Sequence, residues 1–169
     1  MKTIVIFLFL FFYPFAAQAD ENPESFAVYA GVARDDINIY RVSLQSPFDD
    51  WLSDRNIPLK GFFETSLNIL DADDTIYGGA ISPVFGVPLF RVSNYQLSLI
   101  GGIGVSFISE TSINSRNLSS AFQFEDRLGL QLQGNKIGIS ALYLHYSNAG
   151  ISDPNDGLDL FVIGLSFKI

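Results

Sequence analysis

Alternation of apolar with small or polar side chains, along segments of about ten residues, constrains this chain more than any other feature of its sequence. Residues 157–169 show the pattern clearly: Phe161, Ile163 and Leu165 fall on one face of an extended chain, whereas Gly164 and Ser166 fall on the other. Side chains two residues apart share a face of a β-strand, so this period predicts strands. Although 48% of all residues are hydrophobic, nothing after residue 19 reads as a long helix or a 20-residue apolar run. The sequence therefore predicts an all-β fold.

The polar faces of the predicted strands help to distinguish the possible all-β architectures. In residues 121–132, Glu125 and Arg127 share the face opposite Phe124 and Leu128. A soluble sandwich would expose such a polar face to water, whereas a membrane barrel encloses it and turns the apolar face to lipid. The barrel is favoured because the segments have the length of a bilayer-spanning strand, the chain ends on an apolar strand containing Phe167, and tyrosines lie in or near the strands as interfacial girdles would.

The pattern predicts an eight-stranded antiparallel transmembrane β-barrel. A barrel of this size has a lumen filled by side chains, which argues against a diffusion pore. The fourth segment is the least regular, because Gly78, Gly79, Pro83 and Pro88 weaken a strand. The predicted strands are residues 25–34, 37–46, 59–70, 76–87, 94–108, 119–133, 135–147 and 157–169.

Residues 1–19 have the form of a cleaved signal peptide. Lys2 supplies a positive start, residues 4–15 an apolar core too short for a typical membrane helix, and Ala17-Gln18-Ala19 a small-residue cleavage site. Cleavage would leave residues 20–169 as one outer-membrane domain.

The net charge limits the partners. The formal charge is −8, and removal of Lys2 with the signal peptide makes it −9. This excess of acidic residues argues against nucleic acid as a partner. Without cysteine, and with His145 as the single histidine, the chain cannot form disulfides or a zinc site of the usual type.

Three residues near the C-terminus could activate a serine nucleophile. His145 precedes Ser147 by two residues, and Asp159 follows it by fourteen. A turn centred near Ser152 would set His145 opposite Asp159 on paired strands, with Ser147 on the same face as His145. The arrangement predicts a Ser-His-Asp triad and makes a hydrolase the first hypothesis.

The predicted topology also indicates on which side of the membrane the triad lies. With both chain termini in the periplasm, the seventh strand ends and the eighth begins at the cell exterior. Asp159 falls on the apolar face that continues as Phe161 and Ile163, so the triad faces lipid rather than lumen. An outer-leaflet lipid, approached from the side, suits this position.

The C-terminal hairpin resembles one family. The segment from Leu144 to Ile151, with Pro154-Asn155-Asp156-Gly157-Leu158-Asp159, resembles the C-terminal hairpin of the PagL family, the lipid A 3-O-deacylases of Gram-negative outer membranes. Residues 122–129 are similar to the preceding strand of that family. The specific match covers about the last fifty residues.

The resemblance implies hydrolysis of the ester at position 3 of lipid A in lipopolysaccharide, without a cofactor. It implies that Ser147 is the nucleophile, His145 the general base and Asp159 the orienting acid. A known member of the family has glutamate at this last position, and Asp159 is one methylene shorter. The side chains of Asn148 and Asn155 are the candidates for the oxyanion hole, with Asn148 ranked first and backbone N–H groups as the remaining option.

Other interpretations stay open at the sequence level. The segments around Ser147 and Asn155 are also ordinary turn sequences. Asp153-x-Asn155-x-Gly157-x-Asp159 departs from a calcium loop, because its glycine is one position early and Gly164 replaces the bidentate glutamate. A phospholipase-A-like esterase and a structural or adhesive barrel without catalysis are the alternative functions. Contact with outer-membrane lipids is expected, and homodimer formation is left open.

Overall fold

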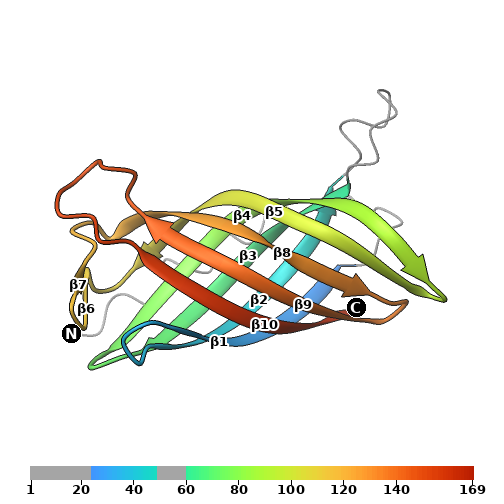
Figure 1. The fold of residues 1–169 in the computed structure, drawn as a ribbon, viewed down its shortest axis with the longest axis horizontal. Helices are drawn as coiled ribbons and strands as arrows, with labels where there is room; N and C mark the ends of the chain where they lie inside the picture. The colour runs from blue at the N-terminus through green and yellow to red at the C-terminus, as the bar shows by residue number, and fades with distance from the viewer. Residues whose placement is uncertain (1–23, 49–59) are drawn as a thin grey trace.

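Eight long antiparallel strands form a closed barrel in the computed structural model, which describes residues 24–48 and 60–169 (Figure 1). The order around the barrel is β1-β10-β9-β8-β5-β4-β3-β2, with β2 closing onto β1. The predicted eight-stranded fold is thus confirmed, whereas the predicted signal peptide lies outside the described residues. The strands are β1 (Ser25–Ala33), β2 (Asn38–Phe48), β3 (Lys60–Asp71), β4 (Thr75–Val92), β5 (Tyr95–Ile108), β8 (Phe122–Gln133), β9 (Ile137–Ser147) and β10 (Leu158–Lys168).

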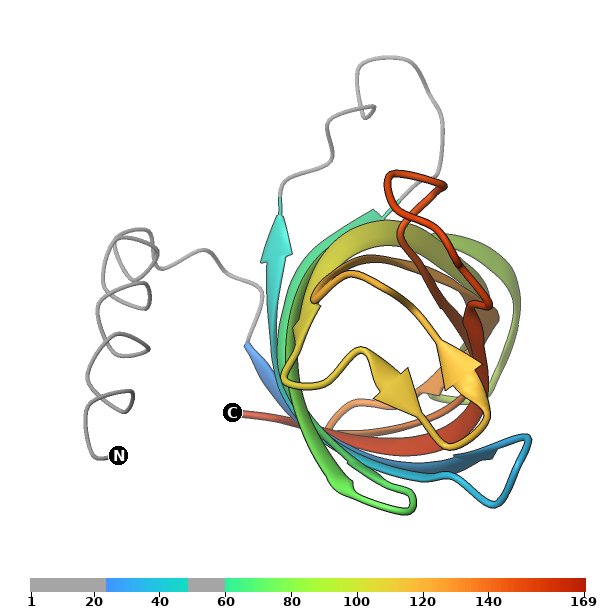
Figure 2. The ribbon, with the colours of Figure 1, turned by 90° about the vertical axis from the view of Figure 1, so that its left-hand side faces the viewer.

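A short hairpin lies between β5 and β8. Its strands, β6 (Ser112–Ile113) and β7 (Arg116–Asn117), pair with each other rather than with the barrel. Figure 2 shows this hairpin across one mouth of the barrel, and Figure 1 shows the β9–β10 loop at the same end. Within the described ranges, no helix is long and apolar enough to cross a membrane.

Strand β4 is more extended than its sequence suggested. It runs for 18 residues, past the predicted end at residue 87. Pro83 stands between the Ile81–Val105 and Val84–Gly102 pairs, and Pro88 adjoins a register shift that ends at Phe90. A strand tolerates prolines at such irregular positions because they need not donate to the ladder there. The predicted 119–133 strand instead begins at Phe122, after Ser119 adopts a positive φ of 50°.

The barrel interior contains a buried group of four ions. Arg41 bonds to Glu64 at 2.7 Å and to Glu125 at 2.5 Å, and Arg127 bonds to the same two carboxylates. Each of these side chains is at most 1% exposed. Buried charges of this kind require paired partners, so the inward polar face of the strands is a packed ionic core.

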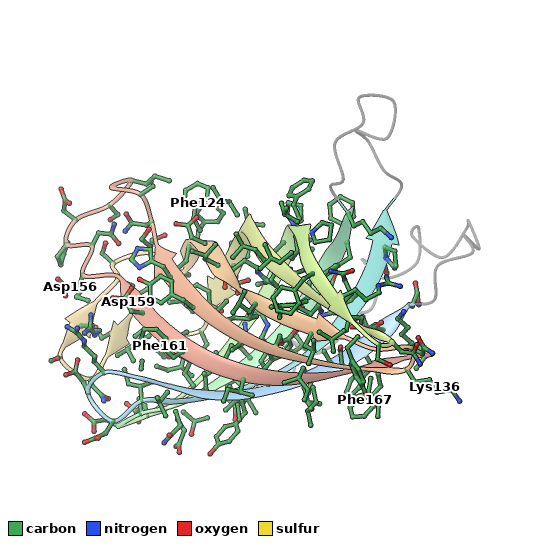
Figure 3. All side chains as sticks on the ribbon, turned by 45° about the vertical axis from the view of Figure 1, so that its right-hand side comes forward. Phe124, Lys136, Asp156, Asp159, Phe161 and Phe167 are labelled. Atoms are coloured by element: carbon green, nitrogen blue, oxygen red, sulfur yellow. The ribbon has the colours of Figure 1, made fainter. Side chains whose placement is uncertain are left out.

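The outer surface of the barrel is apolar. Side chains that alternate with the enclosed polar residues are well exposed, among them Ile103 at 65% and Ile163 at 67%. Figure 3 shows these side chains projecting around the strands, with Asp159 near the loop end and Phe167 and Lys136 toward the other end. A bilayer accounts for this surface, since exposed apolar area on this scale is unfavourable in water.

Candidate active site

The paired ends of β9 and β10 carry the predicted triad residues. His145 lies directly opposite Asp159 in the antiparallel pairing of β9 with β10. A turn centred near Ser152 predicted this pair. The neighbouring residues Leu144, Tyr146 and Leu158 are buried inside the barrel at 0–1% exposure. Because side chains alternate along a strand, these inward residues fix the outward direction of the site residues between them.

Asp159 and His145 are joined by a hydrogen bond. Oδ1 of Asp159 lies 2.7 Å from Nδ1 of His145, and the two side chains are 43% and 33% exposed. A proton on Nδ1 would leave Nε2 of the neutral imidazole free to accept one. The pair thus has the orientation required of an acid-oriented general base.

Ser147 stands on the outward face two residues after His145. It is half-buried and pairs with Phe124 of β8. Within residues 24–48 and 60–169, its hydroxyl makes no side-chain hydrogen bond. The structure therefore brings all three predicted residues to one face and one end of the barrel, and it joins two of them directly.

Asn148 has a structural role in the β9–β10 loop. Its side chain is buried, and Nδ2 donates to the carbonyl oxygens of Leu118 and Ser152, each at 2.9 Å. Its Oδ1 accepts from the N–H of Gly150 at 2.9 Å. Because these bonds use both amide hydrogens, the side chain of Asn148 has none directed toward Ser147, although it ranked first as an oxyanion donor from sequence.

Asn155 contacts the residue that follows Ser147. Its Oδ1 accepts from the backbone N–H of Asn148 at 3.2 Å, which holds the amide group next to the residue that follows Ser147. Within the described part of the chain, its Nδ2 makes no hydrogen bond. Asn155 is therefore the better placed of the two predicted oxyanion donors.

Gly157 packs directly against the imidazole of His145. Its φ of +63° is one that glycine adopts readily, and a Cβ added there would lie 3.0 Å from Cε1 of His145. Its carbonyl accepts from Arg116 at 3.1 Å, and Arg116 also bonds to Asp35 at 3.1 Å. These contacts connect the β6–β7 hairpin and the β1–β2 turn to the edge of the site.

Replacing Gly157 with alanine is expected to lower kcat about 10- to 100-fold, because the added methyl group would push the His145 ring by a few tenths of an ångström from its position against Asp159. Gly150→Ala is the matched control, since Gly150 has a similar φ of +77° but nothing within 4 Å of an added Cβ. Steady-state kinetics on folded protein would test the contrast. Equal losses in the two variants would contradict a packing role for Gly157.

Sequence reasoning did not single out Arg116 or Tyr143. Tyr143 lies on the outward face of β9, and its hydroxyl donates to Asp159 Oδ1 at 2.5 Å. The sequence signal that could have identified Tyr143 is its position two residues before His145, which puts both side chains on the same face of the strand. Within the described residues, no group of three or more histidine, aspartate or glutamate side chains could hold a metal.

Known proteins resemble this chain over most of its length. The family model described as lipid A 3-O-deacylase (PagL) matches residues 38–168. This chain is a member of the PagL family. The lipid A deacylase PagL of Pseudomonas aeruginosa is 33% identical over 137 residues, which cover 77% of this chain and 76% of that protein. The corresponding protein of Bordetella bronchiseptica is 35% identical over 101 residues, 57% of this chain and 56% of that protein.

Solved structures agree with the PagL assignment. The crystal structure of the outer membrane enzyme PagL matches with a TM-score of 0.78 and 26% identity, over 86% of this chain and 99% of that one. The N-terminal barrel of Pseudomonas aeruginosa OprF, at a TM-score of 0.56 and 9% identity over 88% of this chain and 98% of that one, shares the fold alone. As a PagL family member, the chain is an outer-membrane hydrolase of the lipid A 3-O-deacylase class. The predicted family, location and enzyme class are confirmed.

Proposed function

We propose that this protein removes the ester-linked hydroxyacyl chain from position 3 of lipid A, with Ser147 as nucleophile, His145 as general base and Asp159 as orienting acid. The observation that carries the proposal is the 2.7 Å hydrogen bond between His145 and Asp159 on the strand face that Ser147 shares. In a chain of the PagL family, this arrangement supports acyl transfer to serine. Residues 1–19 are proposed to be the cleaved signal peptide that directs export.

The reaction proceeds in two acyl-transfer steps. Oγ of Ser147 attacks the ester carbonyl carbon while Nε2 of His145 takes the hydroxyl proton, and the proton then passes to the departing sugar oxygen. Water next attacks the acyl-enzyme with His145 again as base, which releases a hydroxy fatty acid and restores Ser147. Catalytic hydrogen bonds are often completed only with substrate bound, so an unbonded Ser147 hydroxyl is compatible with this role.

The outer leaflet is the proposed side of action. The site lies at the barrel end that carries the long 109–121 and 148–157 connections, whereas the connections that the structure describes at the opposite end, 93–94 and 134–136, are short turns. Bacterial outer-membrane barrels have long extracellular loops and short periplasmic turns. The outward direction of the half-exposed His145 and Asp159 side chains favours a substrate that approaches from the lipid phase.

Asn155 is proposed to donate to the oxyanion. Asn155→Ala is expected to lower kcat by about 10²-fold with little change in KM, because the lost bond acts on charge that develops during the reaction. Asn155→Asp, which removes the donor while nearly preserving shape, should cause a comparable loss. Kinetics of both variants would check this, and full activity in Asn155→Asp would assign the oxyanion to another donor.

Mass spectrometry of lipid A tests the reaction itself. Wild type and Ser147→Ala would be expressed at matched levels in the outer membrane of Gram-negative cells, and phospholipids would be analysed in parallel. Loss of one hydroxyacyl group from lipid A with wild type alone is the expected result. Unchanged lipid A in both strains, with the barrels folded, would overturn the proposal, and released phospholipid acyl chains would indicate the phospholipase alternative.

A further inference from the structure

Tyr143 makes a direct contact with the proposed triad that the mechanism above does not use. It lies on β9 two residues before His145, so both side chains leave the same face of the strand. Its hydroxyl donates to Oδ1 of Asp159 at 2.5 Å, and the same oxygen lies 2.7 Å from Nδ1 of His145. A single carboxylate oxygen is therefore bonded to both the phenol and the imidazole.

The ring of Tyr143 is held by its neighbour across the sheet. Phe161 lies directly opposite on β10, with ring centroids 5.3 Å apart and planes inclined by 53°. This aromatic pair restrains the ring while the hydroxyl reaches Asp159 in the next row of side chains. Removal of the hydroxyl alone should leave the pair in place, which makes phenylalanine an appropriate substitution.

Asp159 needs hydrogen-bond donors because of where it lies. It carries a carboxylate on the lipid-facing side of the barrel, where charge is unfavourable without hydrogen bonds. Within the described residues, Tyr143 and His145 supply the hydrogen bonds of its side chain.

We infer that Tyr143 is a positioning residue, which holds the Asp159 carboxylate at His145 and thereby keeps the base oriented toward Ser147. The inference rests on the proposed function of these three residues. It assigns to Tyr143 an indirect effect on the chemical step and no contact with the reacting ester.

Tyr143→Phe is the first variant to measure, with Tyr40→Phe as its matched control. Tyr40 is a lipid-facing tyrosine with 53% exposure, and within the described chain its hydroxyl has no hydrogen bond. Tyr143→Phe is expected to lower kcat about tenfold with KM unchanged, the size expected for loss of a bond to a charged group. Tyr40→Phe is expected to retain wild-type kinetics, and heat-modifiable gel migration would verify that both barrels are folded.

A double-mutant cycle separates positioning from a purely structural effect. In an Asp159→Ala background, Tyr143→Phe should cause no further loss, because its effect passes through the missing carboxylate. The reactivity of Ser147 provides a readout that does not depend on lipid A binding. With a p-nitrophenyl alkylphosphonate, Oγ of Ser147 bonds to phosphorus, p-nitrophenolate leaves and His145 accepts the hydroxyl proton. Tyr143→Phe should slow this labelling by the same factor as kcat.

The outcomes distinguish the inference from the proposed function. Wild-type kcat and labelling rate in Tyr143→Phe, or an undiminished tenfold loss in the Asp159→Ala background, would overturn the positioning role. If Ser147→Ala remains active, the proposed triad itself fails. An inactive Ser147→Ala with an unimpaired Tyr143→Phe rejects the inference alone.

Discussion

A Ser147→Ala enzyme is expected to lose at least about 10³-fold in kcat for release of the hydroxyacyl chain, because in the proposed mechanism the Ser147 hydroxyl forms the acyl-enzyme. His145→Asn is expected to cause a similar loss, since the hydroxyl would then lack a base. The two residues act as a unit, so the double variant should be no slower than Ser147→Ala. Timed mass spectrometry of lipid A in mixed micelles would give the rates.

The control for this prediction keeps the barrel and changes a serine elsewhere. Ser152→Ala alters the same loop but removes no hydroxyl hydrogen bond within the described residues, and the Ser152 backbone carbonyl that accepts from Asn148 is retained. It should keep most of the wild-type rate. Losses that multiply in the Ser147–His145 double variant would indicate independent roles and contradict a nucleophile and base that work together.

The register of the β9–β10 hairpin was predictable because it follows from the position of the turn. Once a turn is centred near Ser152, antiparallel pairing requires His145 and Asp159 to be opposite, and the structure has this pair. Alternation likewise gives Ser147 the same face as His145. These relations follow from backbone geometry, which the pattern of apolar residues specifies strongly.

The contacts that sequence reasoning missed depend on side-chain direction or on closure of the barrel. The hydroxyl of Tyr143 meets Asp159 because of the ring orientation beside Phe161, which periodicity does not encode. Asn148 ranked first as an oxyanion donor, yet its amide turns inward to a carbonyl at residue 118, thirty positions earlier. The ion pair between Arg41 and Glu125 joins strands that are far apart in the sequence, so it could be predicted only from the closed barrel.

Glu125→Ala is expected to destabilise the barrel by about 3–5 kcal/mol, the cost of leaving a buried ion without its partner. Arg41 and Arg127 would then share Glu64 as their carboxylate, and a net positive charge would be enclosed in the barrel. Guanidinium unfolding in detergent micelles would measure the loss. Glu110→Ala, which removes a carboxylate from an exposed loop position, should change the free energy of unfolding by less than about 0.5 kcal/mol.

A compensating variant tests whether unpaired charge is the cause of that loss. Glu125→Met combined with Arg127→Met removes one charge of each sign and fills the space with apolar side chains, so it should recover much of the stability. The same network reaches β9, because Tyr146, which lies between His145 and Ser147, donates to Glu125 at 2.7 Å. We therefore expect Glu125→Ala to lower kcat as well. A Glu125→Met/Arg127→Met variant that is no more stable than Glu125→Ala would contradict the role of charge balance and would show that packing makes the ionic core necessary.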